Sequence, residues 1–294
     1  MPIYVVFLSV VAIWSTTPLA IQWSTLGSSF SFSVASRMLI GLAICIVLLI
    51  IQQKKLPVHR QALINYLYAG AGIFITMSLV YYSALSIPSG LISVVFGLTP
   101  IITGVFALLL LKDRFFSLSK AAGLLLGLLG LFTIFKHSFS IAETLLTGLL
   151  SVTLAMTFQA FISVKLKQIN AHTSALETTT GALLVSVPLF ILSWIMLGGE
   201  VPETSLKASL SIGYLAIFGS VIGFVSYYYL IKHASVQVVG IVPLLTPVFA
   251  LLLGSTLNHE HITLTQFFGI TLVLSGLLVY EYGPKKIPKS ISTL

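Results

Sequence analysis

Two charged residues lie inside long apolar stretches of this chain, where charge is costly. Arg37 falls within the stretch 32–52, and Glu177 falls within the stretch 173–197. Ionisable groups inside a membrane-spanning segment are rare and mark substrate or ion pathways. Arg37 is therefore a candidate for binding a substrate carboxylate or forming an outer gate, with snorkelling of its guanidinium to the interface as the alternative. Glu177 is a candidate coupling group, with an acid at a helix start, favoured by the helix dipole, as the alternative.

The other reactive residues form no catalytic or metal-binding pattern. Cys45 is the single cysteine, so neither a disulfide nor a thiolate cluster is available. His259 and His261 flank Glu260, but this trio lacks the ligand spacing of a closed metal site. The sequence has no glycine-rich phosphate-binding motif, which excludes an ATP-driven pump on this chain alone. We therefore expect no enzymatic activity, no cofactor and no metal.

The composition indicates that these residues are positioned by membrane-spanning helices. The chain is 57% hydrophobic and only 7% charged, whereas a soluble domain carries about 25% charged residues. Ten segments are long and apolar enough to cross a hydrocarbon core roughly 30 Å thick as helices. The predicted fold class is an all-α integral membrane protein with ten transmembrane helices. The predicted spans are 3–22, 32–52, 62–84, 89–111, 118–135, 144–164, 173–197, 208–231, 237–257 and 262–282.

A pattern in the first half of the sequence returns in the second half. Thr99-Pro100 returns as Thr246-Pro247, 147 residues later, within a longer set of matching positions. Spans three to five thus correspond to spans eight to ten, an offset of five spans. Because five is odd, corresponding helices run in opposite directions, and such inverted repeats are typical of carriers. The predicted boundaries are 1–137 and 138–283 for the two five-helix repeats and 284–294 for a basic tail.

The distribution of positive charge predicts the orientation in the membrane. With a cytoplasmic N-terminus, twelve of the fifteen basic residues fall on the cytoplasmic side, whereas only Lys136 and Lys207 fall in outer loops. We therefore expect a multi-pass protein of the cell (inner or plasma) membrane with both termini in the cytoplasm. The net charge of +8 is explained by this topology and by anionic lipid headgroups, so nucleic acid is not an expected partner.

Several motifs resemble those of a known group of proteins. They are the stretch from Ile13 to Pro18, the Ser36-Arg37 pair, the Tyr81-Tyr82 pair and the two Thr-Pro pairs, each of which is followed by a loop acid and spaced glycines. In this order the sequence is similar to the drug/metabolite transporter superfamily, and within it to the EamA-like ten-helix transporters. Ser15 and Asp113 depart from the residues usual in that family, which leaves the fold assignment unchanged.

The resemblance implies a secondary transporter that works by alternating access at a central cavity between the two repeats. It favours amino acids as substrates and export as the direction, while the low charge of the spans favours neutral or zwitterionic metabolites. The resemblance also implies that spans five and ten pack together, through Gly123, Gly127 and Gly130 on one side and Gly269 and Gly276 on the other. We expect a monomer, with a homodimer through this face as the alternative. A non-transporting membrane scaffold or receptor is the alternative function.

The candidate residues follow from this arrangement. A small solute needs polar and aromatic groups that replace its hydration. The predicted substrate-binding residues are Trp14, Arg37, Tyr82, Ser93, Phe96, Thr99, Gln159, Tyr228 and Gln237. Tyrosines occur as the pair Tyr81-Tyr82 and as a run over 227–229; at most one side chain of each can face the centre, and Tyr82 and Tyr228 are preferred. Prolines inside spans bend the helix, so the predicted hinges are Pro100, Pro243 and Pro247, with Pro243 expected to give span nine a second break. Glu177 is the candidate for coupling to protons.

Overall fold

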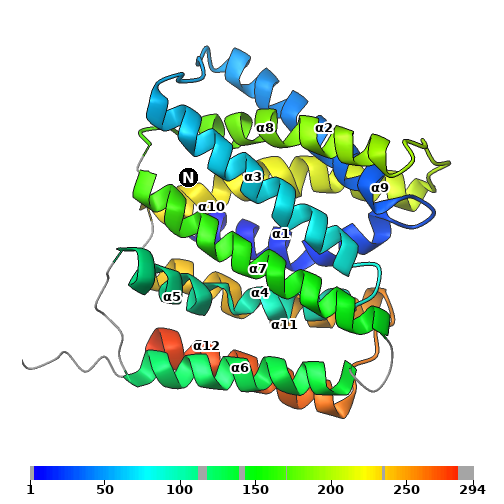
Figure 1. The fold of residues 1–294 in the computed structure, drawn as a ribbon, viewed down its shortest axis with the longest axis vertical. Coiled ribbons are helices and arrows are strands. Elements are labelled where there is room, and N and C mark those ends of the chain that lie inside the picture. Colours follow the sequence, from blue (N-terminus) through cyan, green and yellow to red (C-terminus); the bar gives the residue numbers. More distant parts are fainter. Residues whose placement is uncertain (1–2, 112–117, 139–142, 170, 234–235, 284–294) are drawn as a thin grey trace, which may run out of the picture.

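A computed structural model of the chain describes residues 3–111, 118–138, 143–169, 171–233 and 236–283, and throughout these ranges the regular structure is helical (Figure 1). The elements are α1 (Ile3–Ser24), α2 (Phe30–Ile51), α3 (Arg60–Ser83), α4 (Ser89–Gly97), α5 (Thr99–Leu111), α6 (Leu118–Ser138), α7 (Glu143–Ile169), α8 (Ala175–Met196), α9 (Leu206–Tyr214), the π-helix η1 (Leu215–Ile222), α10 (Gly223–His233), α11 (Val236–Leu257) and α12 (Leu264–Tyr282).

These helices confirm the predicted membrane spans. Within the described residues, eight helical segments are long and apolar enough to cross a membrane, and two shorter apolar segments lie in α6 and α11. Span four consists of α4 and α5, and span eight consists of α9, η1 and α10. The remaining spans are single helices, so the chain has the ten-helix architecture expected from its composition.

Corresponding helices of the two halves lie close together at several levels of the bundle. In Figure 1, α2 and α8 form one edge, α6 and α12 form the opposite edge, and α4 and α11 lie between them. The first helix of each half shows that the halves are inverted. Near its end, α1 contacts Ile87 through a hydrogen bond from Gln22, whereas near its start the corresponding helix α7 contacts Ile87 through Gly148. We call this end of the bundle, where α1 ends and α12 begins, the distal end; the opposite end is the proximal end.

Polar side chains fix where several of the helices begin. The hydroxyl of Ser29 accepts a hydrogen bond from the backbone amide of Phe32 at the start of α2. The α12 helix opens with a capping box, in which the Thr263 hydroxyl and the Gln266 side chain each accept a hydrogen bond from the other residue's backbone amide. Such caps satisfy amides that have no partner within the helix, which matters most where water is scarce.

Span four is interrupted at Leu98, next to the predicted hinge Pro100. Proline has no amide hydrogen, so Pro100 leaves the carbonyl of Phe96, four residues earlier, without its usual donor. The hydroxyl of Thr99 replaces that donor through a 2.6 Å hydrogen bond to the Phe96 oxygen. The side chain thus compensates for a backbone hydrogen bond that membrane lipid could not replace.

The expected second break in span nine is not found. The α11 helix runs continuously from Val236 to Leu257 and contains both Pro243 and Pro247. A membrane helix tolerates proline when neighbouring helices and local adjustments compensate for the lost hydrogen bond. Here α4 packs directly on this region, because a Cβ added to Gly97 would lie 3.4 Å from Pro247 Cγ and 3.5 Å from the Pro243 oxygen. The additional break expected at Pro243 is therefore absent, whereas the predicted hinge Pro100 lies beside the break at Leu98.

Span eight contains a π-helix that the sequence did not predict. Residues Leu215–Ile222 form η1 between two α-helical segments. A π-helix wraps its backbone more widely than an α-helix and is often found at functional sites. Its counterpart in the first half, α3, is assigned as α-helix throughout.

The predicted packing of spans five and ten is confirmed. Gly123 lies against the backbone oxygen of Gly276, and Gly130 lies against that of Gly269, with each added Cβ only 2.6 Å from the facing oxygen. The backbones of α6 and α12 therefore touch at two levels, which only residues without side chains permit. The contact lies within one chain, as expected.

Candidate functional site

Arg37 is buried inside the bundle and does not snorkel to the membrane surface. Its side chain is only 1% exposed. The Nε atom donates a 2.9 Å hydrogen bond to the hydroxyl of Ser220 in η1. The guanidinium also lies against Gly219, where an added Cβ would be 2.8 Å from Nη2. Arg37 therefore joins α2 to the π-helix of the second half.

The hydrogen-bonding capacity of Arg37 is only partly used. Its Nη1 atom is buried and has no hydrogen-bond partner. Within the described residues, no carboxylate lies within ion-pair distance of the guanidinium. A buried, unpaired cation is costly, and the cost falls when an anion binds to it. The unpaired Nη1 is a donor of the kind that pairs well with a carboxylate oxygen.

Glu177 is engaged at the start of α8. Its Oε2 atom accepts a 2.8 Å hydrogen bond from the Ser174 amide, and its own amide donates to the Ser174 hydroxyl at 3.3 Å. These two contacts form a capping box. The alternative expected for Glu177, an acid at a helix start, is therefore the arrangement found. Its role in coupling stays a prediction.

The tyrosine pair of α3 is oriented opposite to the expectation. Tyr82 is 42% exposed and packs edge-on against the ring of Phe30. Tyr81 is fully buried, and its hydroxyl has no hydrogen-bond partner. The sequence could not decide between them, because successive helical residues point about 100° apart and either face could be inward. Tyr81 is thus the better candidate for the interior.

The other predicted site residues lie on several helices. Ser93 is buried and Phe96 half-buried along α4, while Thr99 uses its hydroxyl for the break in span four. Trp14 lies on α1 with its Nε1 beside Gly223, at 3.4 Å from an added Cβ. Gln159 is half-buried in α7, and its side chain makes no hydrogen bond to the part of the chain that the structure describes. The side chains of Tyr228 and Gln237 lie outside the described residues.

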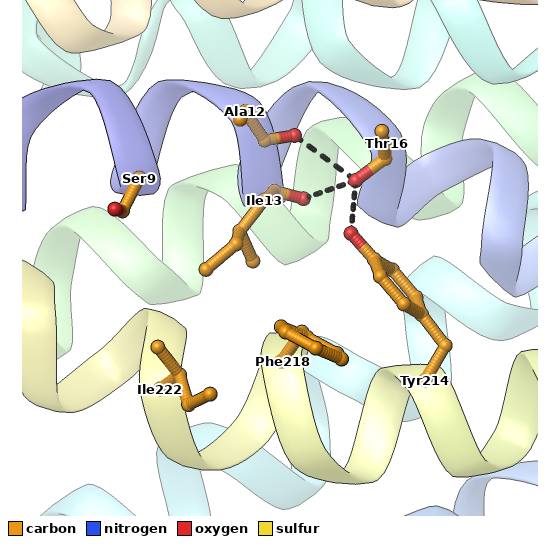
Figure 2. Close-up of a pocket in the computed structure, with 7 residues that line it drawn as sticks. All are labelled: Ser9, Ala12, Ile13, Thr16, Tyr214, Phe218 and Ile222. Atoms are coloured by element: carbon orange, nitrogen blue, oxygen red, sulfur yellow. Dashed lines mark hydrogen bonds between the residues drawn. The ribbon is translucent and has the colours of Figure 1, made fainter.

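A groove of about 360 Å³ separates α1 from α9 and η1 (Figure 2). The polar groups among the lining residues drawn in Figure 2 are the hydroxyl of Ser9, which donates to the carbonyl of Val5, and the hydroxyls of Thr16 and Tyr214, which contact each other at one end. Because Thr16 directs its hydrogen to the carbonyls of its own helix, Tyr214 is the donor. Phe218 and Ile222 are about two-fifths exposed, so the groove opens to the outside of the bundle and suits a lipid chain rather than a polar solute.

The sequence missed the residues that surround Arg37. Ser220 and Gly219 lie 183 and 182 positions further along the chain, in a run of otherwise apolar residues. A hydroxyl in the middle of an apolar span is a weak signal, because serine can bond to its own helix. Only the placement of α2 against η1 shows what Ser220 binds.

The ten-helix bundle of two inverted halves, with polar groups buried between them, defines a multi-pass membrane transporter rather than an enzyme. The chain belongs to the EamA-like transporter family, whose sequence pattern it matches over residues 1–136 and again over 146–281. A solved crystal structure has the same fold, with a TM-score of 0.67 at 20% identity, covering 94% of this chain and 96% of the other.

Relatives of similar length are also named as transporters. "Uncharacterized transporter YoaV" of Bacillus subtilis (strain 168) is 26% identical over 95% of this chain and 97% of its own. "Uncharacterized inner membrane transporter YedA" of Escherichia coli (strain K12) is 25% identical over 98% of this chain and 93% of its own. A third relative from the same strain, "Probable amino-acid metabolite efflux pump", is 26% identical over 67% of this chain and 68% of its own.

Proposed function

We propose that this transporter is a secondary carrier of small zwitterionic metabolites, with amino acids as the substrate class and export as the direction. The observation that carries the proposal is the buried guanidinium of Arg37, which has an unpaired Nη1 atom and no acidic partner among the described residues. A carboxylate would complete its hydrogen bonds and balance its charge. The name of one relative, an amino-acid metabolite efflux pump, agrees with this substrate class.

Alternating access supplies the mechanism. The two inverted halves can exchange conformations, so that a central site opens first to one side of the membrane and then to the other. The break at Leu98 and the prolines of α11, Pro243 and Pro247, lie where α4 and α11 pack together, so flexing there would change the path between the halves. Protons are the proposed coupling ion, and a monomer is the proposed working unit.

The proposed orientation in the inner or plasma membrane places both termini in the cytoplasm. Most of the described basic residues lie at the proximal end, with Lys207 at the distal end as an exception. The proximal ones follow α2, begin α3 and α6 or end α7, and include Lys54, Arg60, Lys120 and Lys165. Basic residues remain on the cytoplasmic side during insertion. The distal end is then extracellular or periplasmic.

Counterflow in liposomes tests the proposal. Purified protein should exchange a labelled amino acid but not the amine that has the same side chain and no carboxylate. Arg37→Ala and Gln159→Ala should reduce exchange while the amount of folded protein stays unchanged. Unchanged exchange in both variants would remove Arg37 and Gln159 from the site. Folded protein that exchanges nothing from a broad metabolite panel would support the alternative, a membrane scaffold or receptor.

A further inference from the structure

A carboxylate from the second half occupies the start of a helix in the first half. Glu260 lies in the connection between α11 and α12 at the distal end. Its Oε1 accepts hydrogen bonds from the amide and the hydroxyl of Ser89, at 3.0 and 2.7 Å, and its Oε2 accepts from the amide of Gly90 at 3.2 Å. The start of α4 is thus capped from the other half of the chain, where free amides and the helix dipole favour an anion.

Asn258 extends this contact to α1. Its Nδ2 donates to Glu260 Oε1 and to Gln22 Oε1, both at 3.0 Å, and its Oδ1 accepts from Trp23 Nε1 at 3.0 Å. Gln22 in turn donates to the carbonyl of Ile87 at 2.7 Å. One asparagine and one glutamate therefore bind the end of α1 and the start of α4 to the α11–α12 connection.

The neighbouring span eight also reaches this cluster. The ammonium of Lys207, near the start of α9, lies 4.0 Å from the centroid of the Trp23 ring. This is a cation–π contact between the second half and the first. The contacts of Glu260, Asn258 and Lys207 with the first half all connect residues at least 170 positions apart, so they connect the halves rather than stabilise either one.

We propose that Gln22, Trp23, Ser89, Asn258 and Glu260 form a distal latch, which closes the path between the halves at the distal end and opens during transport. The inference rests on the proposed alternating-access function. In this proposal the path from the centre reaches the distal side between the ends of α1, α4 and α11, which the latch holds together. Four of its residues are half-buried and Ser89 is buried, and water can hydrogen-bond to their polar groups once they separate, so the contact is reversible.

A distance measurement between spin labels tests the latch without any substrate. Labels at Leu26→Cys and Leu257→Cys, both exposed at the distal end, report the separation of α1 from α11, in a Cys45→Ala background. Glu260→Gln keeps the shape of the side chain but turns an NH2 group toward an amide donor, so a population at longer distance should appear. Asn258→Ala should give the same shift.

Matched controls make the result decisive. Glu200→Gln removes the same charge from an exposed acid at the same end and should leave the distances as in the parent. A second label pair, Leu128→Cys and Phe268→Cys, lies on exposed faces of α6 and α12 and should keep its distance in every folded variant. Parent-like distal distances in both Glu260→Gln and Asn258→Ala, with the second pair intact, would overturn the latch. A failure of parent protein to exchange any metabolite would instead overturn the proposed function, whatever the labels report.

Discussion

The Nε atom of Arg37 in α2 and the Oγ atom of Ser220 in η1 are joined by a buried 2.9 Å hydrogen bond across the two halves of the chain. This contact leaves Nη1 without a partner. An arginine with a purely structural role would be expected to have all its donors paired. The unpaired Nη1 therefore favours a role in binding substrate. The first two predictions follow from this pair.

Replacing Arg37 by methionine should strongly reduce exchange without lowering stability. A buried, incompletely paired charge can often be replaced by an apolar residue of similar size at no cost, or with a gain of about 1–4 kcal/mol. Loss of a charge-assisted hydrogen bond to substrate, worth about 1.5–3 kcal/mol, corresponds to at least a roughly tenfold drop in exchange. Thermal unfolding in detergent and counterflow in liposomes measure the two effects. A Met variant that unfolds at lower temperature and still exchanges would show a structural role.

Gly219→Ala should destabilise the protein, because the new Cβ would lie 2.8 Å from Arg37 Nη2. The atom that it meets ends a long side chain and can shift, although the guanidinium is buried and bonded to Ser220, so we expect the low end of the about 1–3 kcal/mol that core overpacking costs. Combining it with Arg37→Ala should restore stability, since the clashing group is then absent. Gly213→Ala is the matched control, because nothing lies within 4 Å of its added Cβ, and it should be neutral or slightly stabilising. Equal losses in the two alanine variants would contradict the proposed clash.

Gly123→Ala should lower stability by about 1–3 kcal/mol, because its Cβ would lie 2.6 Å from the backbone oxygen of Gly276. A backbone atom cannot move aside as a flexible side chain can. Thr271→Ala, at an exposed position of α12, serves as the control and should change the unfolding temperature little. If Gly123→Ala unfolds at the parent temperature, the close approach of α6 and α12 is not present in the membrane.

Thr99→Val should destabilise span four by about 1–3 kcal/mol, because it removes the hydroxyl that donates to the Phe96 carbonyl. The shape of the side chain is nearly unchanged, so packing is retained. In a Pro100→Ala background the regained amide can bond to that carbonyl, and the same substitution should cost less. The loss of unfolding free energy caused by Thr99→Val is compared between the parent and the Pro100→Ala background. A smaller loss in that background shows that the hydroxyl replaces the missing amide, whereas equal losses would contradict this role.

Glu177→Gln should leave both exchange and its pH dependence unchanged if the residue acts only as a cap. Glutamine can still accept a hydrogen bond from the Ser174 amide, as the Gln266 side chain does from the Thr263 amide at the start of α12. Glu177→Ala, in contrast, should lower stability by about 1 kcal/mol through loss of the cap. Loss of proton-driven exchange in Glu177→Gln, with stability intact, would instead assign the coupling role to this acid.

The sequence predicted the spans well because membrane insertion imposes a length and an apolar composition on each one. The segment 173–197, for instance, corresponds to α8 at Ala175–Met196. It could not locate the π-helix of span eight, because the same apolar residues suit both hydrogen-bond patterns. The sequence also predicted an extra break in span nine, but α11 is continuous and contains both Pro243 and Pro247. Proline shows where a helix lacks a hydrogen bond, while the neighbouring helices decide whether it breaks.

The candidate site was predictable only in part. Arg37 could be singled out from one segment, since charge is rare there, but its burial depends on η1, which lies far along the chain. The choice between Tyr81 and Tyr82 required the packing of α3, because both residues have the same local pattern. The distal latch combines residues from α1, α4 and the α11–α12 connection, each ordinary in its own sequence context.

The glycine contacts of α6 and α12 limit how the two halves can move. Because their backbones touch at Gly123–Gly276 and at Gly130–Gly269, tilting one helix against the other would open an empty space that neither lipid nor water could fill. We expect this edge of the molecule to act as a fixed fulcrum, as the label pair on Leu128 and Phe268 would show. The halves can then move by rotating about this edge, so the largest displacements are expected at the opposite edge, formed by α2 and α8.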